Sequence, residues 1–415
     1  MPGSVLPVTT AARRARVGVA TLFLTNGALF ATVVPRYPEI KADLGLSNTA
    51  FGSAVAGYGL GALLLGLLSG LLVTRWGSAR VATASALLIA ANVTLLGVAP
   101  TWAALAGAMF LAGSLDSVAD VAVNAHGLRV ERAYGRSILN SLHGVWSIGA
   151  VVGAGLGTAA AGLGVPLLVH LPVVAVLFAA LAAGASRLLL PGPDGSDRPA
   201  ATTRPAEPGG SRATGRRGRA VAVLGGVAVL GTVAATAQVA EDTGATWGAV
   251  YLRQELGATA VVGGLAFTAL QAAQTVGRLL GDRVVTRFGD RAVARAGAAM
   301  AGGAMAVALA RPWPPSTVVA FAVVGLGIGT LIPACMRAAD SLPGLAPGVG
   351  LTLVGSVLRI SILAAPPLVG LVADAWSLRV ALLLVPLACA LAVLLAGALP
   401  AGGHARPAQP GPGRA

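Results

Sequence analysis

The sequence predicts an all-α membrane protein whose twelve transmembrane helices form two pseudo-symmetric six-helix bundles. Of its 415 residues, 56% are hydrophobic and only 11% are charged, and the mean hydropathy is +0.81. A soluble domain carries roughly 25% charged residues, so a water-facing surface of ordinary composition cannot be assembled from this chain. Two further observations support the prediction: a series of apolar segments of membrane-spanning length, and a motif that occurs at the same place in both halves.

The apolar segments account for most of the chain. A helix needs about 20 mostly apolar residues to cross the hydrocarbon core of a bilayer. Segments of that length predict spans at residues 17–35, 48–73, 79–98, 102–127, 138–163, 165–190, 220–251, 259–285, 290–310, 315–340, 346–372 and 377–399. No small-residue cleavage site follows a short apolar core near the start, so we expect residues 17–35 to be a retained helix and not a signal peptide.

The basic residues predict the orientation. The net charge of +14 comes from 29 basic residues, of which all but Lys41 are Arg. If the N terminus is cytoplasmic, two of them (Arg278 and Arg359) fall inside predicted helices, and 22 lie on the cytoplasmic side. The outer side holds only five: Arg36, Lys41, Arg253, Arg311 and Arg379. This positive-inside bias predicts a multi-pass protein with both termini in the cytoplasm. The preference for Arg, Ala and Gly indicates a GC-rich bacterial genome, and hence the bacterial inner membrane.

One segment breaks the apolar pattern. Residues 191–219 are rich in Pro, Gly and Arg and cannot bury an apolar face, so they are predicted to form a disordered cytoplasmic linker. The linker separates an N-terminal bundle (1–190) from a C-terminal bundle (220–400), which a cytoplasmic tail (401–415) follows. No aromatic residue is interleaved with its arginines, so anionic lipid is a better partner for them than nucleic acid.

The two halves repeat a loop motif. Thr74-Arg75-Trp76-Gly77 follows the second predicted span, and Thr286-Arg287-Phe288-Gly289 follows the eighth, 212 residues later. A match in both place and pattern indicates duplicated six-helix halves.

With six plus six spans and a long central loop, the chain resembles the major facilitator superfamily (MFS). The family signature G-x-L-x-D-R-x-G-R-R is matched by Gly70, Leu72, Arg75 and Gly77. The signature Asp is replaced by Thr74 and the basic pair after the second Gly is degraded, so the first half lacks the Asp on which the family builds its charge lock. In the second half Asp282 stands one turn before the corresponding position and could take that role, in a motif that also contains Arg287 and Gly289.

Three strings resemble the fucose-permease-like bacterial branch of this family. They are Asp120-Val121-Ala122-Val123-Asn124 followed by Glu131, Ser141-Leu142-His143-Gly144-Val145-Trp146-Ser147-Ile148-Gly149, and Glu241 with Trp247, Tyr251 and Leu252. The resemblance implies a secondary transporter that works by alternating access, with two bundles rocking about a site near the bilayer midplane.

Ionisable residues inside predicted spans are the main candidates for function, because a charge at the centre of a membrane helix costs at least about 2.5 kcal/mol. Asp116, Asp120 and Asn124 are spaced i, i+4, i+8 and share one helix face, which we expect to line the cavity. A carboxylic acid shielded from water can exchange a proton near neutral pH, as proton-coupled transport requires. The alternative is a structural role, in which these acids pair with Arg359 or cap backbone groups.

The other candidates are less specific. Glu241 and Asp242 fall near the outer end of the 220–251 span, where Glu241 is the better candidate and Asp242 is expected to be solvated. Arg359 lies mid-span and would either neutralise an acid or bind an anionic group of the solute. For the remaining polar candidates, packing between helices is an equal alternative to contact with the solute; they are His143, Trp146, Asn26, Gln271 and Gln274.

The sequence therefore predicts a secondary active transporter for a small, polar, sugar-like solute, coupled to protons and working as a monomer. The alternatives are a proton-driven exporter of drug-like or hydrophobic metabolites and, from another class, a membrane receptor that does not transport. An enzyme is not expected, since no Ser/His/Asp set or HExxH motif occurs. Cys335 and Cys389 lack metal-ligand spacing, and neither a metal nor another cofactor is expected.

Overall fold

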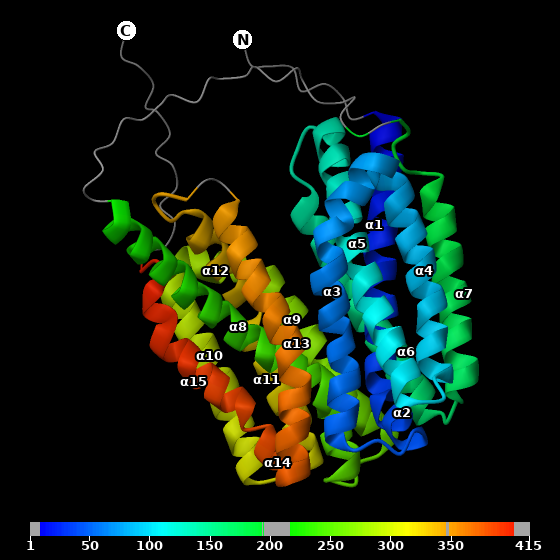
Figure 1. The fold of residues 1–415 in the computed structure, drawn as a ribbon, viewed down its shortest axis with the longest axis vertical. Coiled ribbons are helices and arrows are strands. Elements are labelled where there is room, and N and C mark those ends of the chain that lie inside the picture. Colours follow the sequence, from blue (N-terminus) through cyan, green and yellow to red (C-terminus); the bar gives the residue numbers. More distant parts are fainter. Residues whose placement is uncertain (1–8, 193, 195–215, 346–347, 402–415) are drawn as a thin grey trace.

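The computed structural model describes residues 9–192, 194, 216–345 and 348–401, and these residues fold into helices and short connections without a strand (Figure 1). Twelve helical spans are long and apolar enough to cross a membrane, as predicted. The predicted linker and tail lie largely outside the described residues. The linker is shorter than predicted, because helix already begins at Arg216.

The N-terminal half supplies six spans. The first combines α1 (Thr10–Val33), the 3-10 turn η1 (Val34–Arg36) and α2 (Tyr37–Asp43). The others are α3 (Asn48–Trp76), α4 (Ser78–Val98), α5 (Trp102–Tyr134), α6 (Leu139–Gly162) and α7 (Leu167–Ser186).

The C-terminal half supplies the other six. They are α8 (Arg216–Gln254), α9 (Ala260–Phe288), α10 (Asp290–Ala310), α11 (Pro314–Ile328) joined to α12 (Leu331–Asp340), α13 (Val349–Ala375), and α14 (Leu378–Ala381) followed by α15 (Leu384–Leu395) and η3 (Ala396–Ala398).

Within each bundle, glycine allows helices to pack with their backbones in contact. A Cβ on Gly113 of α5 would lie 1.9 Å from the carbonyl oxygen of Tyr58 on α3, and a Cβ on Gly61 of α3 would lie 2.0 Å from that of Phe110 on α5. Small residues are what let membrane helices approach this closely, since lipid provides no hydrophobic drive to bring them together.

The two bundles meet at one end and diverge toward the end that carries the chain termini (Figure 1). The helix pairs that join them most extensively are α3 with α13 and α6 with α9, and α2 also contacts α8. At the joined end, Asp374 of α13 accepts hydrogen bonds from the backbone N–H groups of Asn48 (3.0 Å) and Thr49 (2.7 Å), which begin α3. The Lys41 ammonium also donates to the side chain of Gln254, across the bundles, at 3.1 Å. Polar contacts between the halves therefore reinforce the closed end.

The repeated loop motif adopts one conformation in both halves, as expected for duplicated halves. Gly77 and Gly289 have φ of +85° and +82°, in the region that favours glycine, and each ends its helix by donating a 2.8 Å hydrogen bond to a Val carbonyl four residues earlier. Gly70 has open space around it, and Arg75 is exposed.

Candidate functional site

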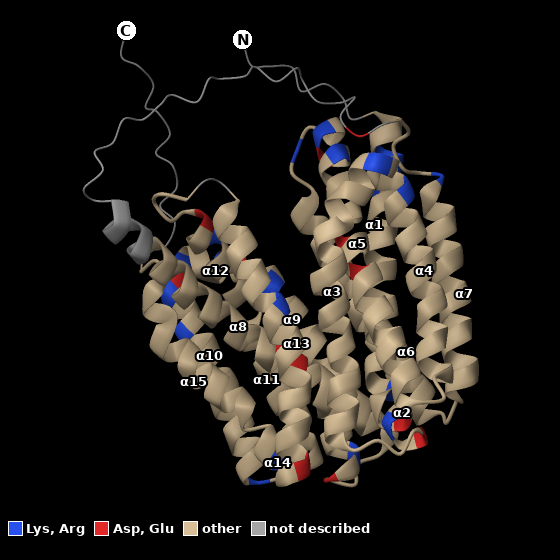
Figure 2. Ribbon diagram, viewed as in Figure 1, with Lys and Arg blue, Asp and Glu red and all other residues tan. Residues whose placement is uncertain are grey.

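A cavity of about 200 Å³ lies between the bundles, next to their closed end. It is lined by Phe30, Val34, Tyr37, Val55, Tyr58, Asp116, Trp146, Gln238, Glu241, Asp242, Ala245, Thr246, Ile362 and Pro366. Both halves of the chain therefore contribute to it. Figure 2 shows that charged residues gather toward the ends of the helices, with a few acids at mid-height. Three of the residues that line the cavity are carboxylates (Asp116, Glu241 and Asp242), although only 11% of the chain is charged.

The N-terminal bundle holds Asp116 in a hydrogen-bond network. Asn26 of α1 donates to one carboxylate oxygen at 2.9 Å, and the Tyr58 hydroxyl of α3 donates to the other at 2.7 Å. The indole N–H of Trp146 on α6 in turn donates to the side-chain oxygen of Asn26 at 2.7 Å. Four helices thus converge on one acid, and three of the predicted candidates are in direct contact. Tyr58 is a fourth member that sequence reasoning missed, because a lone Tyr in an apolar span carries no distinguishing pattern.

Asp120 and Asn124 extend the same face of α5 toward the end of the molecule that carries the termini. The Asn124 amide donates to Asp120 at 2.9 Å, and the His143 Nε2 of α6 lies 3.1 Å from the Asn124 side-chain oxygen. Asp120 and His143 are exposed and do not line the closed cavity. The predicted common face is therefore present, with Asp116 inside the cavity and the other two residues outside it.

The C-terminal bundle contributes Glu241 and Asp242 from the middle of α8. The Gln274 amide of α9 donates to Glu241 at 2.6 Å, and the guanidinium of Arg278 lies 3.9 Å from the same oxygen. Gln238 donates to one oxygen of Asp242 at 3.0 Å, whereas the other oxygen is buried and has no hydrogen-bond partner among the described residues. Sequence reasoning also missed Gln238 and Arg278.

Two expectations about this pair were wrong. Glu241 is not near the outer mouth, because α8 continues to Gln254, thirteen residues or about 20 Å further on. Asp242 is not simply solvated, since it is partly buried and lines the cavity. The helix also runs without a break through Thr243 and Gly244.

The remaining candidates lie beside the cavity. The guanidinium carbon of Arg359 on α13 is 3.3 Å from the place where a Cβ on Gly66 of α3 would stand, so this side chain reaches the opposite bundle. Among the described residues, no acid lies within 4.0 Å of the Arg359 guanidinium, so the predicted ion pair with Asp116 or Asp120 is not formed in this structure. Gln271 is buried on α9 and does not line the cavity.

Charged contacts flank the repeated loops, although not through the predicted Asp282, which forms no ion pair with the described residues. In the second half, Asp290 lies 2.9 Å from Arg337 of α12. The offset of 212 residues places Ser78 at the equivalent position in the first half. There, Asp194 accepts hydrogen bonds from the backbone and hydroxyl of Ser78 and lies 3.5 Å from Arg129 of α5. Asp194, from the predicted linker, thus places a carboxylate beside Ser78, where the second half has the carboxylate of Asp290 itself.

Other residues of the strings quoted for the narrower resemblance have structural roles. Glu131 accepts hydrogen bonds from the N–H groups of Ile138 (2.7 Å) and Leu139 (2.9 Å), where α6 begins. Trp247 and Tyr251 are fully buried, and the Trp247 ring meets that of Phe51 edge-on at 5.7 Å across the bundles. Neither residue lines the cavity.

Among the described residues, twelve membrane-length helices in two bundles surround a cavity that holds three carboxylates, which is the architecture of a multi-pass α-helical membrane protein. The model of the Major Facilitator Superfamily matches residues 19–244 and 229–414, and the chain belongs to that family.

Relatives of similar length support the assignment. The uncharacterised transporter y4wD of Sinorhizobium fredii is 33% identical over 384 residues, which cover 92% of this chain and 97% of the relative. The membrane protein MosC of Rhizobium meliloti is 28% identical, over 92% of this chain and 88% of its own.

Solved structures share the fold. The nucleoside transporter NupG has a TM-score of 0.71 at 13% identity, covering 92% of this chain and 98% of its own. A bacterial homologue of the human lysosomal transporter Spinster, described as inward-facing and unoccupied, has a TM-score of 0.73 at 14% identity, covering 94% and 98%. These findings do not establish the fucose-permease-like branch, which stays a prediction.

Proposed function

We propose that this protein is a proton-coupled secondary active transporter of a small polar solute, and that the cavity between the bundles is its solute site. The observation that carries the proposal is the cavity itself: Asp116 from one bundle and Glu241 and Asp242 from the other line a single space in the middle of the molecule. Acids are expensive inside a membrane and are found there mainly where they serve transport or proton relay.

The orientation follows from the distribution of charge. The positive-inside bias assigns the end that carries the termini to the cytoplasm of a bacterial cell. The bundles diverge at that end (Figure 1), and Asp120 and His143 are exposed there, so the structure corresponds to an inward-facing state. Alternating access then requires the contacts at the outer end, such as Asp374 with Asn48 and Thr49, to open while the inner end closes.

Proton coupling is assigned to the acids of the cavity. Both oxygens of Asp116 already accept hydrogen bonds, whereas Asp242 has one buried oxygen without a partner among the described residues. A buried oxygen of this kind is costly unless it binds a proton, a water or a polar group of the solute. Asp242 is therefore the first candidate for the group that alternates between proton and solute, with Asp116 and Asp120 as further members of the path.

The solute is expected to be small and to carry hydrogen-bond donors, because three carboxylates, which accept hydrogen bonds when ionised, line the cavity. The partly buried Trp146 adds a ring surface on which a cyclic solute can stack. Sugars and sugar-bearing rings such as nucleosides, the solute class named for the structural neighbour NupG, form the first panel to test.

The test is uptake of labelled solutes into proteoliposomes that contain the purified monomer, with and without an imposed pH gradient. We expect one polar solute to accumulate only when the gradient is present, and Asp242→Asn to abolish that accumulation. Flux that never responds to pH contradicts proton coupling, and flux restricted to hydrophobic cations supports the exporter instead. Binding of a solute without flux under any gradient supports the receptor.

A further inference from the structure

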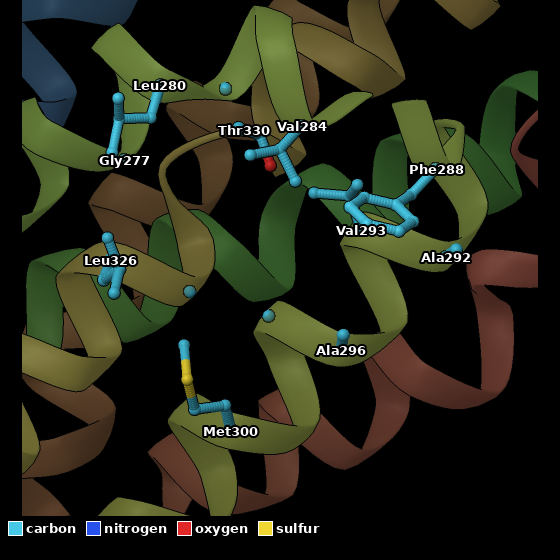
Figure 3. Close-up of a pocket in the computed structure, with 13 residues that line it drawn as sticks. Gly277, Leu280, Val284, Phe288, Ala292, Val293, Ala296, Met300, Leu326 and Thr330 are labelled. Atoms are coloured by element: carbon cyan, nitrogen blue, oxygen red, sulfur yellow. The ribbon is translucent and has the colours of Figure 1, made fainter. Parts of the chain in front are cut away.

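A second cavity, of about 510 Å³, lies outside the solute site on the C-terminal bundle. Figure 3 shows its walls, which come from α9, α10 and the junction of α11 with α12. The lining residues are Gly277, Leu280, Gly281, Val284, Phe288, Ala292, Val293, Ala296, Gly297, Met300, Leu326, Gly327 and Thr330. Thr330 is the only one with a polar side chain. We call this space the α9–α10 groove; it shares no residue with the lining of the central cavity.

The groove exists because glycines bring the helices beneath it into backbone contact. A Cβ on Gly297 of α10 would lie 2.3 Å from the carbonyl oxygen of Gly327, and one on Gly277 of α9 would lie 2.8 Å from that of Leu326. α11 therefore lies against both helices, and its glycine floor leaves the space between them without side chains. The walls remain open to the surroundings: Leu280 is 45% exposed and Met300 is 44% exposed.

The length of the groove matches one leaflet of a bilayer. From Gly277 to Phe288 is eleven residues of helix, or about 17 Å, close to half of a hydrocarbon core that is about 30 Å thick. Phe288 ends α9 on the side of the chain termini, so the groove runs from that membrane surface toward the midplane. An apolar space of this depth fits an acyl chain better than a compact solute.

Two arginines that form no ion pair with the described residues lie at the surface end of the groove. The guanidinium carbon of Arg287 lies 5.4 Å from the ring centre of Phe288, which forms the rim. Arg283 is exposed one turn earlier, and neither arginine forms an ion pair with the described residues. By contrast, Arg291 is engaged with the carbonyl of Leu399. Asp282, an exposed acid on the same helix, is about 140° away from Arg287 around α9.

We propose that the α9–α10 groove binds an acyl chain of an anionic phospholipid from the leaflet on the side of the termini, with the headgroup phosphate on Arg287. The apolar walls, which span one leaflet, contact the acyl chain. The Arg287 guanidinium, which forms no ion pair with the described residues, binds the phosphate at the membrane surface. An uncharged lipid would use the walls but not the arginine. The inference does not depend on which solute the central cavity binds.

The test uses the full chain, reconstituted in phosphatidylcholine with a small fraction of phosphatidylglycerol that carries a photoactivatable group on one acyl chain. Mass spectrometry then locates the labelled residues. We expect label on residues 277–300 and 326–330. Arg287→Gln should lower it roughly fivefold, because one arginine near a charged membrane surface contributes on the order of 1 kcal/mol. Ala296→Trp, which fills the groove from α10, should lower it for any lipid.

Matched variants separate these effects from misfolding. Arg75→Gln alters the equivalent arginine of the first half, and Ala180→Trp adds an indole at an exposed position of α7; both should leave the groove label unchanged. A photoactivatable phosphatidylcholine with the same chain reports folding in the two arginine variants, and the thermal midpoint on size-exclusion chromatography reports folding in the two tryptophan variants. Equal labelling by the two lipids, or label that Ala296→Trp does not reduce, would overturn the proposal. Cross-links from the groove to a second copy of the chain in place of lipid would also overturn it.

Discussion

The carboxylate of Asp374 accepts the backbone N–H of Thr49 at 2.7 Å, which joins the end of α13 in one bundle to the start of α3 in the other. The same carboxylate accepts the N–H of Asn48 at 3.0 Å. The start of a helix carries unpaired N–H groups and a partial positive charge, so an acid from the opposite bundle serves as its cap. This contact can exist only while the two bundles are joined at this end, so it acts as a latch for the state seen in the structure.

Asp374→Ala should therefore shift the population toward molecules that are open at the end where the bundles are joined in the structure. Loss of the exposed capping interaction is worth about 1 kcal/mol, or roughly a fivefold change in the ratio of the two states. Spin labels at Leu163 and Trp313, exposed residues in the connections from α6 to α7 and from α10 to α11 at that end, would report a larger fraction of long distances. Asp340→Ala is the control, because Asp340 caps the N–H of Gly348 inside one bundle (2.7 Å). An unchanged distance distribution in Asp374→Ala would contradict the latch.

Asp194 is predicted to stabilise the first half in the way that Asp290 stabilises the second, because the first half has Ser78 at the position of Asp290. Asp194→Ala removes two hydrogen bonds to Ser78 and the contact with Arg129, and should lower the apparent Tm by a few degrees. Adding Ser78→Asp restores an acid at the position that Asp290 occupies in the second half, and should recover most of the loss.

Ser78→Asp alone should destabilise the protein, because it places two carboxylates side by side. Asp282→Ala, at an exposed acid without an ion pair among the described residues, should leave Tm unchanged. The prediction is wrong if the double variant is no more stable than Asp194→Ala.

Gly113→Ala should damage the solute site through packing. The added methyl group would lie 1.9 Å from the carbonyl oxygen of Tyr58, so α3 and α5 must separate and the Tyr58 hydroxyl must move relative to Asp116. Overpacking of this kind costs about 1–3 kcal/mol. We expect a lower thermal midpoint on size-exclusion chromatography and a larger loss of uptake. Gly107→Ala on the same helix has nothing within 4 Å and should behave like the wild type; equal effects of the two substitutions would contradict this account.

Asp242→Asn should separate proton coupling from solute movement. The amide keeps the size of the side chain but cannot carry a proton between the two sides, so accumulation driven by a pH gradient should be lost. Exchange of labelled for unlabelled solute needs no net proton movement and should continue. Asp43→Asn, at an exposed acid where α2 ends, is the control and should retain both activities. Loss of exchange together with accumulation would assign Asp242 to solute binding alone.

The membrane spans and the internal repeat were predictable because each is a property of one segment. An apolar stretch of about 20 residues becomes a helix in a bilayer whatever surrounds it, since its backbone has no other way to satisfy its hydrogen bonds. Gly77 and Gly289 were likewise recognisable, because a backbone turn with φ near +85° favours glycine in either half. The face shared by Asp116, Asp120 and Asn124 followed from helical spacing alone.

The tertiary structure decided which polar residues meet, because each partner comes from a distant part of the chain. Tyr58 reaches Asp116 across 58 positions, and Asp374 reaches Thr49 across 325. Asp242 illustrates the difference: its position along α8 indicated solvent, whereas packing of the two bundles places it in the central cavity with one oxygen unpartnered among the described residues. Amino-acid type and spacing determine what a helix can bury and where it spans. Burial and hydrogen-bond partners arise only when α3, α5, α8 and α13 come together.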